Sequence, residues 1–478
     1  MLTTITELRA QFIAGTYTPL QAFESMRQVI DTTDAEIHAF LDVYDDARED
    51  AQKATERYAR EGEKAPMLLG MPLAIKNNIL IKGKRATAGS KMLEHYTAPY
   101  DATVITSLRE QGALFIGGTN LDEFAMGSST ENSAFGVTHN PIDPSRVPGG
   151  SSGGSGAAVA MGAAVAALGT DTGGSVRLPA SFCGNIGFKP TYGRISRHGL
   201  IAMGSSLDQA GTFTNSVRDA EILFEVLHGK DRYDATTISE DTFPPIPLKE
   251  RYRIGVPRDF LGEGMDADVL ALFNKKVADL VSAGHEVVDV SLPLMKKGLA
   301  AYYIVMPAEV SSNLARYDGM RFGLHVEGKD LLEDYMKTRA LGFGAEVKRR
   351  ILLGTYVLSA GYYDAYYGKA EHVRTMMRAE MAEVYERVDL IMTPTAPTPA
   401  FKIGEKSDPL SMYLADIFTV PVNLIGVPAI SIPGGAVVRD GIALPVGIQY
   451  IAPHAGDERL FDFGKRTYDS VRGVESMV

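Results

Sequence analysis

The chain has 478 residues, a formal net charge of −11 and a single cysteine, and 45% of its residues are hydrophobic. This composition is typical of a globular protein with a sizeable core and excludes a disordered chain. One cysteine excludes an internal disulfide and a multi-cysteine metal site. The acidic balance argues against a phosphate-binding surface spread over the whole molecule.

The sequence also predicts the cellular location of the protein. It contains no uninterrupted apolar run of about 18 residues, which a membrane span requires. The first residues, MLTTITELRAQF, lack the basic start and apolar core of a secretory signal. We therefore expect a cytoplasmic protein without a membrane span.

The N-terminal third begins with helical patterns. Residues 1–62 predict a helical layer, in which Thr18 and Pro19 form a typical helix start. Residues 70–75 then predict a short buried strand that ends at Lys76, and a helix at 102–111 leads into a strand at 113–116.

The remaining chain continues this alternation of strands and helices. We predict a surface excursion at 229–249 and mostly helices from 299 to 388. The alternation favours an α/β/α sandwich with a central mixed β-sheet covered by helices, and the lack of an internal repeat favours one domain over 1–478. Further strands are predicted at 168, 186–188, 253–256, 286–290, 390–392, 429–432 and 446–451.

Residues 147–177 form a glycine-rich run with two glycine-flanked serine sites, at Ser151 and Ser175. Such a density of glycine is typical of backbone that needs positive φ or a close approach to a ligand. A flexible Gly/Ser linker is the simpler interpretation. The apolar segments 157–161 and 163–168 argue against it, because a solvated linker would not carry them.

A serine needs a neighbouring base to become a nucleophile, and the glycine-rich run contains no histidine. Two overlapping G-x-S-x-G matches permit an α/β-hydrolase nucleophile elbow, but that interpretation leaves the later Gly-Gly-Ser unexplained. Lys76 is the alternative base, since burial would favour its neutral form. An edge lysine whose amine reaches solvent is the competing interpretation.

Lys76, residues 149–154 and residues 169–177 together resemble the signature of the amidase signature family. The resemblance implies Ser175 as the nucleophile, Ser151 as a bridging serine after a cis peptide, and Lys76 as the base. It also implies an oxyanion hole formed by backbone N–H groups. These are the N–H groups of Thr172, Gly173, Gly174 and Ser175.

Neighbouring residues are assigned supporting roles or depart from the family pattern. Asn77 stands where family members commonly have aspartate, which removes a charge beside Lys76. The residues that we expect to support the structure rather than to react are Ser152, Ser155, Asp171 and Cys183.

Four further segments, 122–133, 311–319, 346–355 and 361–367, resemble the glutamine-hydrolysing component of aminoacyl-tRNA amidotransferases. This narrower resemblance implies that Arg350 binds the carboxylate of glutamine, that Asp416 binds its amino group, and that Tyr302 lines the pocket. For Arg350, an ordinary helix-surface pair with Glu346 is the alternative.

The same resemblance implies a heterotrimer with B and C subunits. Ammonia released from glutamine would pass to the B subunit, which would activate Glu-tRNA(Gln) with ATP and Mg²⁺; whether Asp-tRNA(Asn) is also a substrate stays open. This chain would hold no cofactor. A free-standing amidase acting on small or aryl amides is the second hypothesis. A non-catalytic scaffold is the third, and Lys76, Ser151 and Ser175 argue against it.

Overall fold

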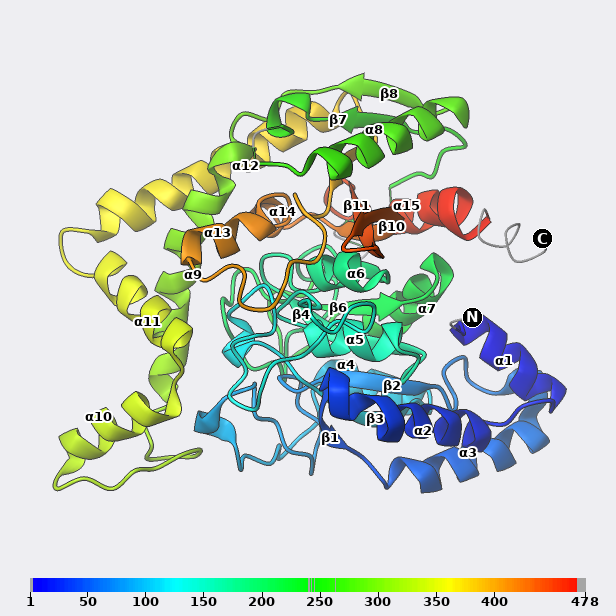
Figure 1. Ribbon diagram of the computed structural model, residues 1–478, viewed down its shortest axis with the longest axis horizontal. Helices are drawn as coiled ribbons and strands as arrows, with labels where there is room; N and C mark the ends of the chain where they lie inside the picture. The colour runs from blue at the N-terminus through cyan, green and yellow to red at the C-terminus, as the bar shows by residue number, and fades with distance from the viewer. Residues whose placement is uncertain (1–2, 240, 242, 245, 263, 471–478) are drawn as a thin grey trace.

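The computed structural model describes residues 3–239, 241, 243–244, 246–262 and 264–470. In this part of the chain, one eleven-stranded sheet runs through the molecule in the order β1-β3-β2-β4-β6-β5-β10-β11-β9-β7-β8, with helices packed around it (Figure 1). The strands are β1 Phe40–Val43, β2 Pro72–Lys76, β3 Leu114–Thr119, β4 Ala166–Asp171, β5 Ile186–Lys189, β6 Gln209–Thr214, β7 Arg253–Val256, β8 Glu286–Asp289, β9 Leu390–Pro394, β10 Ala429–Arg439 and β11 Ile442–Ile451.

The sheet is mixed, which confirms the predicted α/β class. Strand β2 pairs in parallel with β3 and β4, whereas β4 and β5 both pair antiparallel with β6. At the other end, β7 is parallel to both β8 and β9. Because β2 and β4 are parallel neighbours, Lys76 and Asp171 end their strands at the same edge of the sheet.

The helices account for most of the remaining regular structure. Thr18 caps α2 through a capping box with Gln21, and Pro19 opens the helix, as the sequence predicts. The α-helices are α1 Ile5–Ala14, α2 Pro19–Ile37, α3 Ala47–Glu61, α4 Thr103–Glu110, α5 Gly153–Ala160, α6 Arg177–Cys183, α7 Val217–Leu227, α8 Ala267–Ser282, α9 Gly298–Asn313, α10 Leu331–Gly342, α11 Ala345–Val357, α12 Lys369–Tyr385, α13 Pro409–Tyr413, α14 Val420–Ile425 and α15 Asp457–Gly464.

Two strands have no counterpart among the predicted ones. Strand β1 lies within the N-terminal helical segment and pairs antiparallel with β3 at one edge of the sheet. Strand β6 has the sequence QAGTFT, is buried along its whole length, and lies between β4 and β5. A central strand is covered on both faces, so its sequence lacks the apolar and polar alternation that marks a half-buried strand.

Residues 299–388 are mostly helical, as predicted, and α10 and α11 project at the left of the molecule in Figure 1. No helix or strand is found among the described residues of 229–249, in agreement with the predicted surface excursion. No helix within the described ranges is both long enough and apolar enough to cross a bilayer.

Candidate active site

Lys76 lies at the C-terminal end of β2 and has no solvent-exposed surface. Its Nζ is 2.8 Å from Ser151 Oγ and 2.8 Å from Thr170 Oγ1. The amine therefore points inward to the glycine-rich run, which excludes the edge-lysine interpretation. Burial lowers the pKa of Lys76 to about 7, although the charges of nearby aspartates oppose this change.

Ser151 contacts Lys76, and the residue that follows it contacts the segment around Ser175. The peptide bond between Gly150 and Ser151 is cis, as expected. The next N–H, that of Ser152, donates to the backbone carbonyl of Ser175 at 3.2 Å. The two serine sites that are separated in sequence are thus neighbours in the fold.

Ser175 lies between the end of β4 and the start of α6. The residue is 8% exposed, whereas Lys76 and Ser151 are wholly buried. Its Oγ forms no hydrogen bond in the described part of the chain, so the hydroxyl is free to meet a substrate. Of the three proposed catalytic side chains, it is the one that reaches the surface of the site.

A buried carboxylate organises the loop that carries Ser175. Asp171 accepts hydrogen bonds from the N–H groups of Gly174 (2.9 Å) and Val176 (3.1 Å). It also pairs with the Arg177 guanidinium at 2.9 Å, with both side chains fully buried. Although burial opposes it, the Arg177 charge brings the pKa of Asp171 well below its usual range, so the carboxylate stays ionised.

This arrangement distinguishes the four N–H groups of the predicted oxyanion hole. The Gly174 N–H donates to Asp171 Oδ1 at 2.9 Å. The N–H groups of Thr172, Gly173 and Ser175 have no acceptor among the described residues and remain available. A Cβ at Gly174 would lie 2.2 Å from Thr419 Oγ1 at a φ of +132°, so only glycine fits there.

Arg350 is buried, with 3% of its surface exposed. Its Nε donates to Glu346 Oε1 at 2.8 Å, so the helix pair that the alternative interpretation predicts does exist. The same guanidinium also lies over the rings of Tyr303 and Tyr413, which are stacked 3.8 Å apart. A small cavity of about 190 Å³ is lined by both Glu346 and Arg350, so the pair faces a space rather than open solvent.

Asp416 and Tyr302 lie on the side of the site near α9 and α14. Asp416 is 8% exposed and accepts a hydrogen bond from the Ser128 hydroxyl. Burial raises the pKa of its carboxyl to about 7, although Ser128 and the Arg350 charge oppose the rise. The ring and hydroxyl of Tyr302 lie against Gly173, where an added Cβ would be 2.8 Å from Tyr302 Oη.

The sequence analysis did not predict several polar residues whose hydrogen bonds position the residues of this site. Asp208 Oδ1 accepts the Thr172 hydroxyl at 2.7 Å, and burial raises the pKa of Asp208 to about 6. Glu123 accepts the N–H of Gly344, which is the N-cap of α11, at 2.8 Å. Asp208 belongs to no recognisable sequence motif. Glu123 and Ser128 lie in segment 122–133, whose resemblance to the amidotransferase component could have indicated them.

No group of three or more histidine, cysteine or acidic side chains within the described residues is arranged to hold a metal ion. Cys183 is buried, as expected, and burial raises the pKa of its thiol well above the usual range.

The Amidase family model matches residues 21–461, and the chain belongs to that family. It is similar to the A subunit of glutamyl-tRNA(Gln) amidotransferase from Koribacter versatilis, with 52% identity over 440 residues and 90% of each chain covered. The corresponding protein from Microcystis aeruginosa is 47% identical, with 96% of each chain covered. Among solved structures, the corresponding protein from Thermotoga maritima has a TM-score of 0.77 at 42% identity, covering 96% of this chain and 92% of its own.

Proposed function

We propose that this chain is the glutaminase subunit of a Glu-tRNA(Gln) amidotransferase, with Ser175, Ser151 and Lys76 as its catalytic residues. The observation that carries the proposal is the 2.8 Å contact between the fully buried Lys76 Nζ and Ser151 Oγ, beside the loop that presents Ser175. A buried amine with a pKa near 7 is a suitable base at neutral pH.

In the first step, Ser175 Oγ attacks the side-chain amide carbon of glutamine. Its proton passes to Ser151 and the Ser151 proton to neutral Lys76, while the free N–H groups of Thr172, Gly173 and Ser175 stabilise the oxyanion. The C–N bond then breaks, and the amine returns the proton through Ser151 to the leaving ammonia. Water attacks the resulting glutamyl ester, which releases glutamate and regenerates Ser175.

The substrate assignment follows from charge. Arg350 would bind the α-carboxylate of glutamine and ionised Asp416 its ammonium group, because each offers the opposite charge in a buried setting. Glu346 pairs with Arg350 in the structure and would hold the guanidinium in place. Tyr302, packed on Gly173, would form the wall between the oxyanion loop and the bound amino acid.

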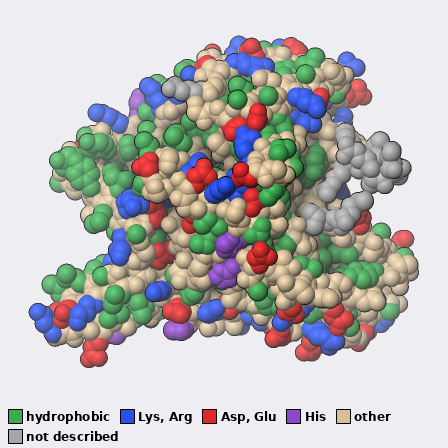
Figure 2. Space-filling model, viewed as in Figure 1, with side chains coloured by type: hydrophobic (Ala, Val, Ile, Leu, Met, Phe, Trp, Pro, Cys, Tyr) green, Lys and Arg blue, Asp and Glu red, His purple; other side chains and the backbone are tan. Residues whose placement is uncertain are grey.

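We further propose that the chain is one catalytic domain that acts in the cytoplasm with B and C subunits, and that ATP, Mg²⁺ and most contacts to tRNA belong to the B subunit. Figure 2 supports this division, because acidic and basic side chains are interspersed on the visible face without a continuous basic band. Protein interfaces commonly bury apolar and aromatic side chains, and several such side chains are exposed here, which supports binding to a partner subunit. They are Leu352, Leu353, Tyr356, Tyr362, Tyr363 and Tyr366.

The experiment is a glutaminase assay on the complex purified from its native host, followed by glutamine-dependent amidation of Glu-tRNA(Gln). Ser175→Ala should abolish ammonia release while free ammonia still supports amidation, because only the glutaminase step is lost. Ser25→Ala, which alters an exposed helix position, is the matched control. Undiminished glutamine hydrolysis by Ser175→Ala would refute the proposal, and steady hydrolysis of aryl amides without a response to glutamine would favour the free-standing amidase.

A further inference from the structure

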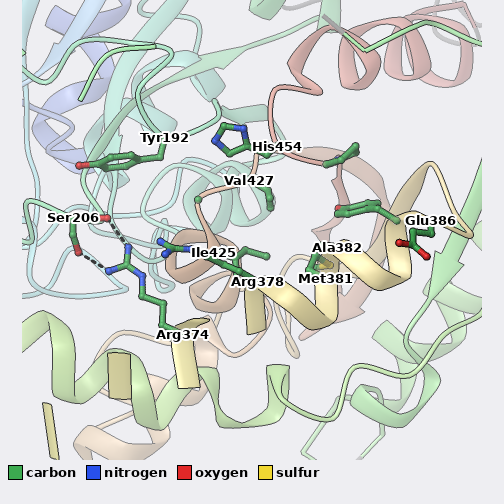
Figure 3. Close-up of a pocket in the computed structure, with 13 residues that line it drawn as sticks. Tyr192, Ser206, Arg374, Arg378, Met381, Ala382, Glu386, Ile425, Val427 and His454 are labelled. Carbon is green, nitrogen blue, oxygen red and sulfur yellow. Dashed lines mark hydrogen bonds between the residues drawn. The ribbon is translucent and has the colours of Figure 1, made fainter. Parts of the chain in front are cut away.

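A second cavity, of about 820 Å³, lies between α12, the end of α14 and the segment after β11 (Figure 3). Its volume is in the range of small-molecule sites, which is about 300–1,000 Å³. Much of its wall is apolar and includes Met381, Ile425, Val427 and Pro453. None of the proposed catalytic or glutamine-binding residues lines it, so it is a separate site.

Two guanidinium groups from successive turns of α12 reach this cavity, and they differ in their partners. Arg374 pairs with Glu371 and donates to the hydroxyl and the carbonyl of Ser206, both at 2.9 Å. Arg378 has no ion pair within the described ranges and forms a single 3.4 Å hydrogen bond to the Leu424 carbonyl. Partial burial and the charge of Arg374 lower the pKa of Arg378, and the charge of Glu371 opposes this change.

The other polar groups of the wall leave the cavity electropositive near Arg378. His454 lines the same space, and the Oη of Tyr385 is buried without a hydrogen-bond partner among the described residues. The carboxylate on the rim belongs to Glu386, which lies at the opposite end from Arg378 in Figure 3. A ligand with an anionic group at the Arg378 end and an apolar body would therefore match the wall.

One hydrogen-bonded connection joins the cavity to the loop of Ser175 through α14. The Leu424 carbonyl, to which Arg378 donates, also accepts from Arg374 Nε at 2.6 Å. The preceding residue, Asn423, donates its side-chain amide to Asp171 Oδ1 at 3.0 Å. A shift of the arginines would thus move the end of the short helix that contacts the carboxylate of the loop.

A second connection reaches the loop from the other side. Ser206, which binds Arg374, is two residues before Asp208, and Asp208 accepts the Thr172 hydroxyl. Thr172 is one of the residues whose N–H remains available as an oxyanion donor. The two connections therefore end on the side chains of Asp171 and Thr172, which belong to the loop that carries Ser175.

We propose that this cavity is a second ligand site, for a small carboxylate with an apolar body, and that its occupancy is transmitted to the Ser175 loop. The carboxylate binds Arg378, and the apolar body lies against Met381, Ile425 and Val427. Transmission rests on the proposed function, whereas ligand binding does not. Binding and transmission are therefore tested separately.

Binding is tested by calorimetry on the full chain with 4-phenylbutyrate, and with 4-phenylbutanol as the uncharged probe. The acid should bind about tenfold or more tightly than the alcohol, and Arg378→Met should remove this preference. Ala382→Trp, which fills the cavity without changing its charge, should weaken binding of the acid by a similar factor. Arg387→Met, an exposed arginine just beyond α12, is the control that should leave binding unchanged. Equal affinities for acid and alcohol, binding that survives both cavity variants, or no measurable binding at millimolar concentration would overturn the site.

Transmission is tested by the rate at which a fluorophosphonate labels Ser175. Saturating 4-phenylbutyrate should change that rate by about fivefold in the unmodified chain and leave it unchanged in Arg378→Met. An identical rate with and without the acid would overturn the transmission. Absence of labelling under all conditions would instead count against the proposed catalytic serine, so the two failures are distinguishable.

Discussion

Asp171 and Arg177 form a fully buried ion pair at 2.9 Å, and the loop that they close contains Ser175. Each partner forms further hydrogen bonds. Asp171 accepts hydrogen bonds from backbone N–H groups of the loop, and Arg177 donates to the Thr419 carbonyl and to the Gln449 side chain. Buried charges require this degree of satisfaction, because an unpaired charge in the interior is costly. The pair therefore fixes the loop conformation before any substrate binds.

Replacing Asp171 by asparagine should destabilise the protein by about 3–5 kcal/mol, because it leaves the Arg177 charge buried without its counter-charge. The measurement is the free energy of unfolding in urea. Asp45→Asn, at an exposed ion pair with Arg27, should change that free energy by less than about 1 kcal/mol. The double variant Asp171→Ala/Arg177→Met should cost less than the sum of its single variants; strict additivity would show that the pair does not act as a unit.

Lys76→Met and Lys76→Arg should both lower kcat for glutamine by about 10³-fold or more. Methionine removes the base, and arginine cannot be deprotonated in a protein, so neither can accept the Ser151 proton. Lys82→Met, a nearby exposed lysine, should retain full activity. A Lys76→Arg enzyme with substantial kcat would show that the side chain acts as a fixed charge rather than as a base.

The pH dependence of kcat/KM should report two deprotonations. Burial lowers the pKa of Lys76 to about 7 and raises that of Asp416 to about 7, and both groups are proposed to act in their deprotonated forms. Below about pH 7 the logarithm of kcat/KM should therefore rise with a slope approaching 2, and it should level off above that pH. Asp416→Asn should reduce the slope to 1; a slope that stays near 2 in this variant would remove Asp416 from the titration.

Arg350→Met should raise the KM for glutamine by about 100-fold with a much smaller change in kcat, because the guanidinium binds the α-carboxylate and not the reacting amide. Arg349→Met is the matched control, since Arg349 also pairs with Glu346 but is half exposed. If both variants raised KM equally, the effect would belong to Glu346 and the helix rather than to a contact with substrate.

The sequence predicted most of the sheet because buried strands such as 253–256 and 429–432 are short apolar runs bounded by turns. It did not predict β6, whose small and polar residues become buried only because β4 and β5 flank them. The pattern of Lys76 with the two serine sites was visible as a motif, and the contact between Lys76 and Ser151 agrees with it. By contrast, the hydrogen-bond partners of Asp416 and Thr172 are Ser128 and Asp208, and local sequence patterns could not predict these pairs.

The amino-acid sequence by itself determined the α/β class, the family and the side chains proposed for the chemistry, because these depend on local hydrophobic pattern and on residue types in a fixed order. Only the tertiary structure decided which backbone N–H groups are free, since Asp171 takes that of Gly174 and leaves those of Thr172, Gly173 and Ser175. It also decided that the Lys76 amine is buried. Both depend on contacts between segments far apart in the chain, and protonation and hydrogen-bond availability are set by such surroundings rather than by the residue itself.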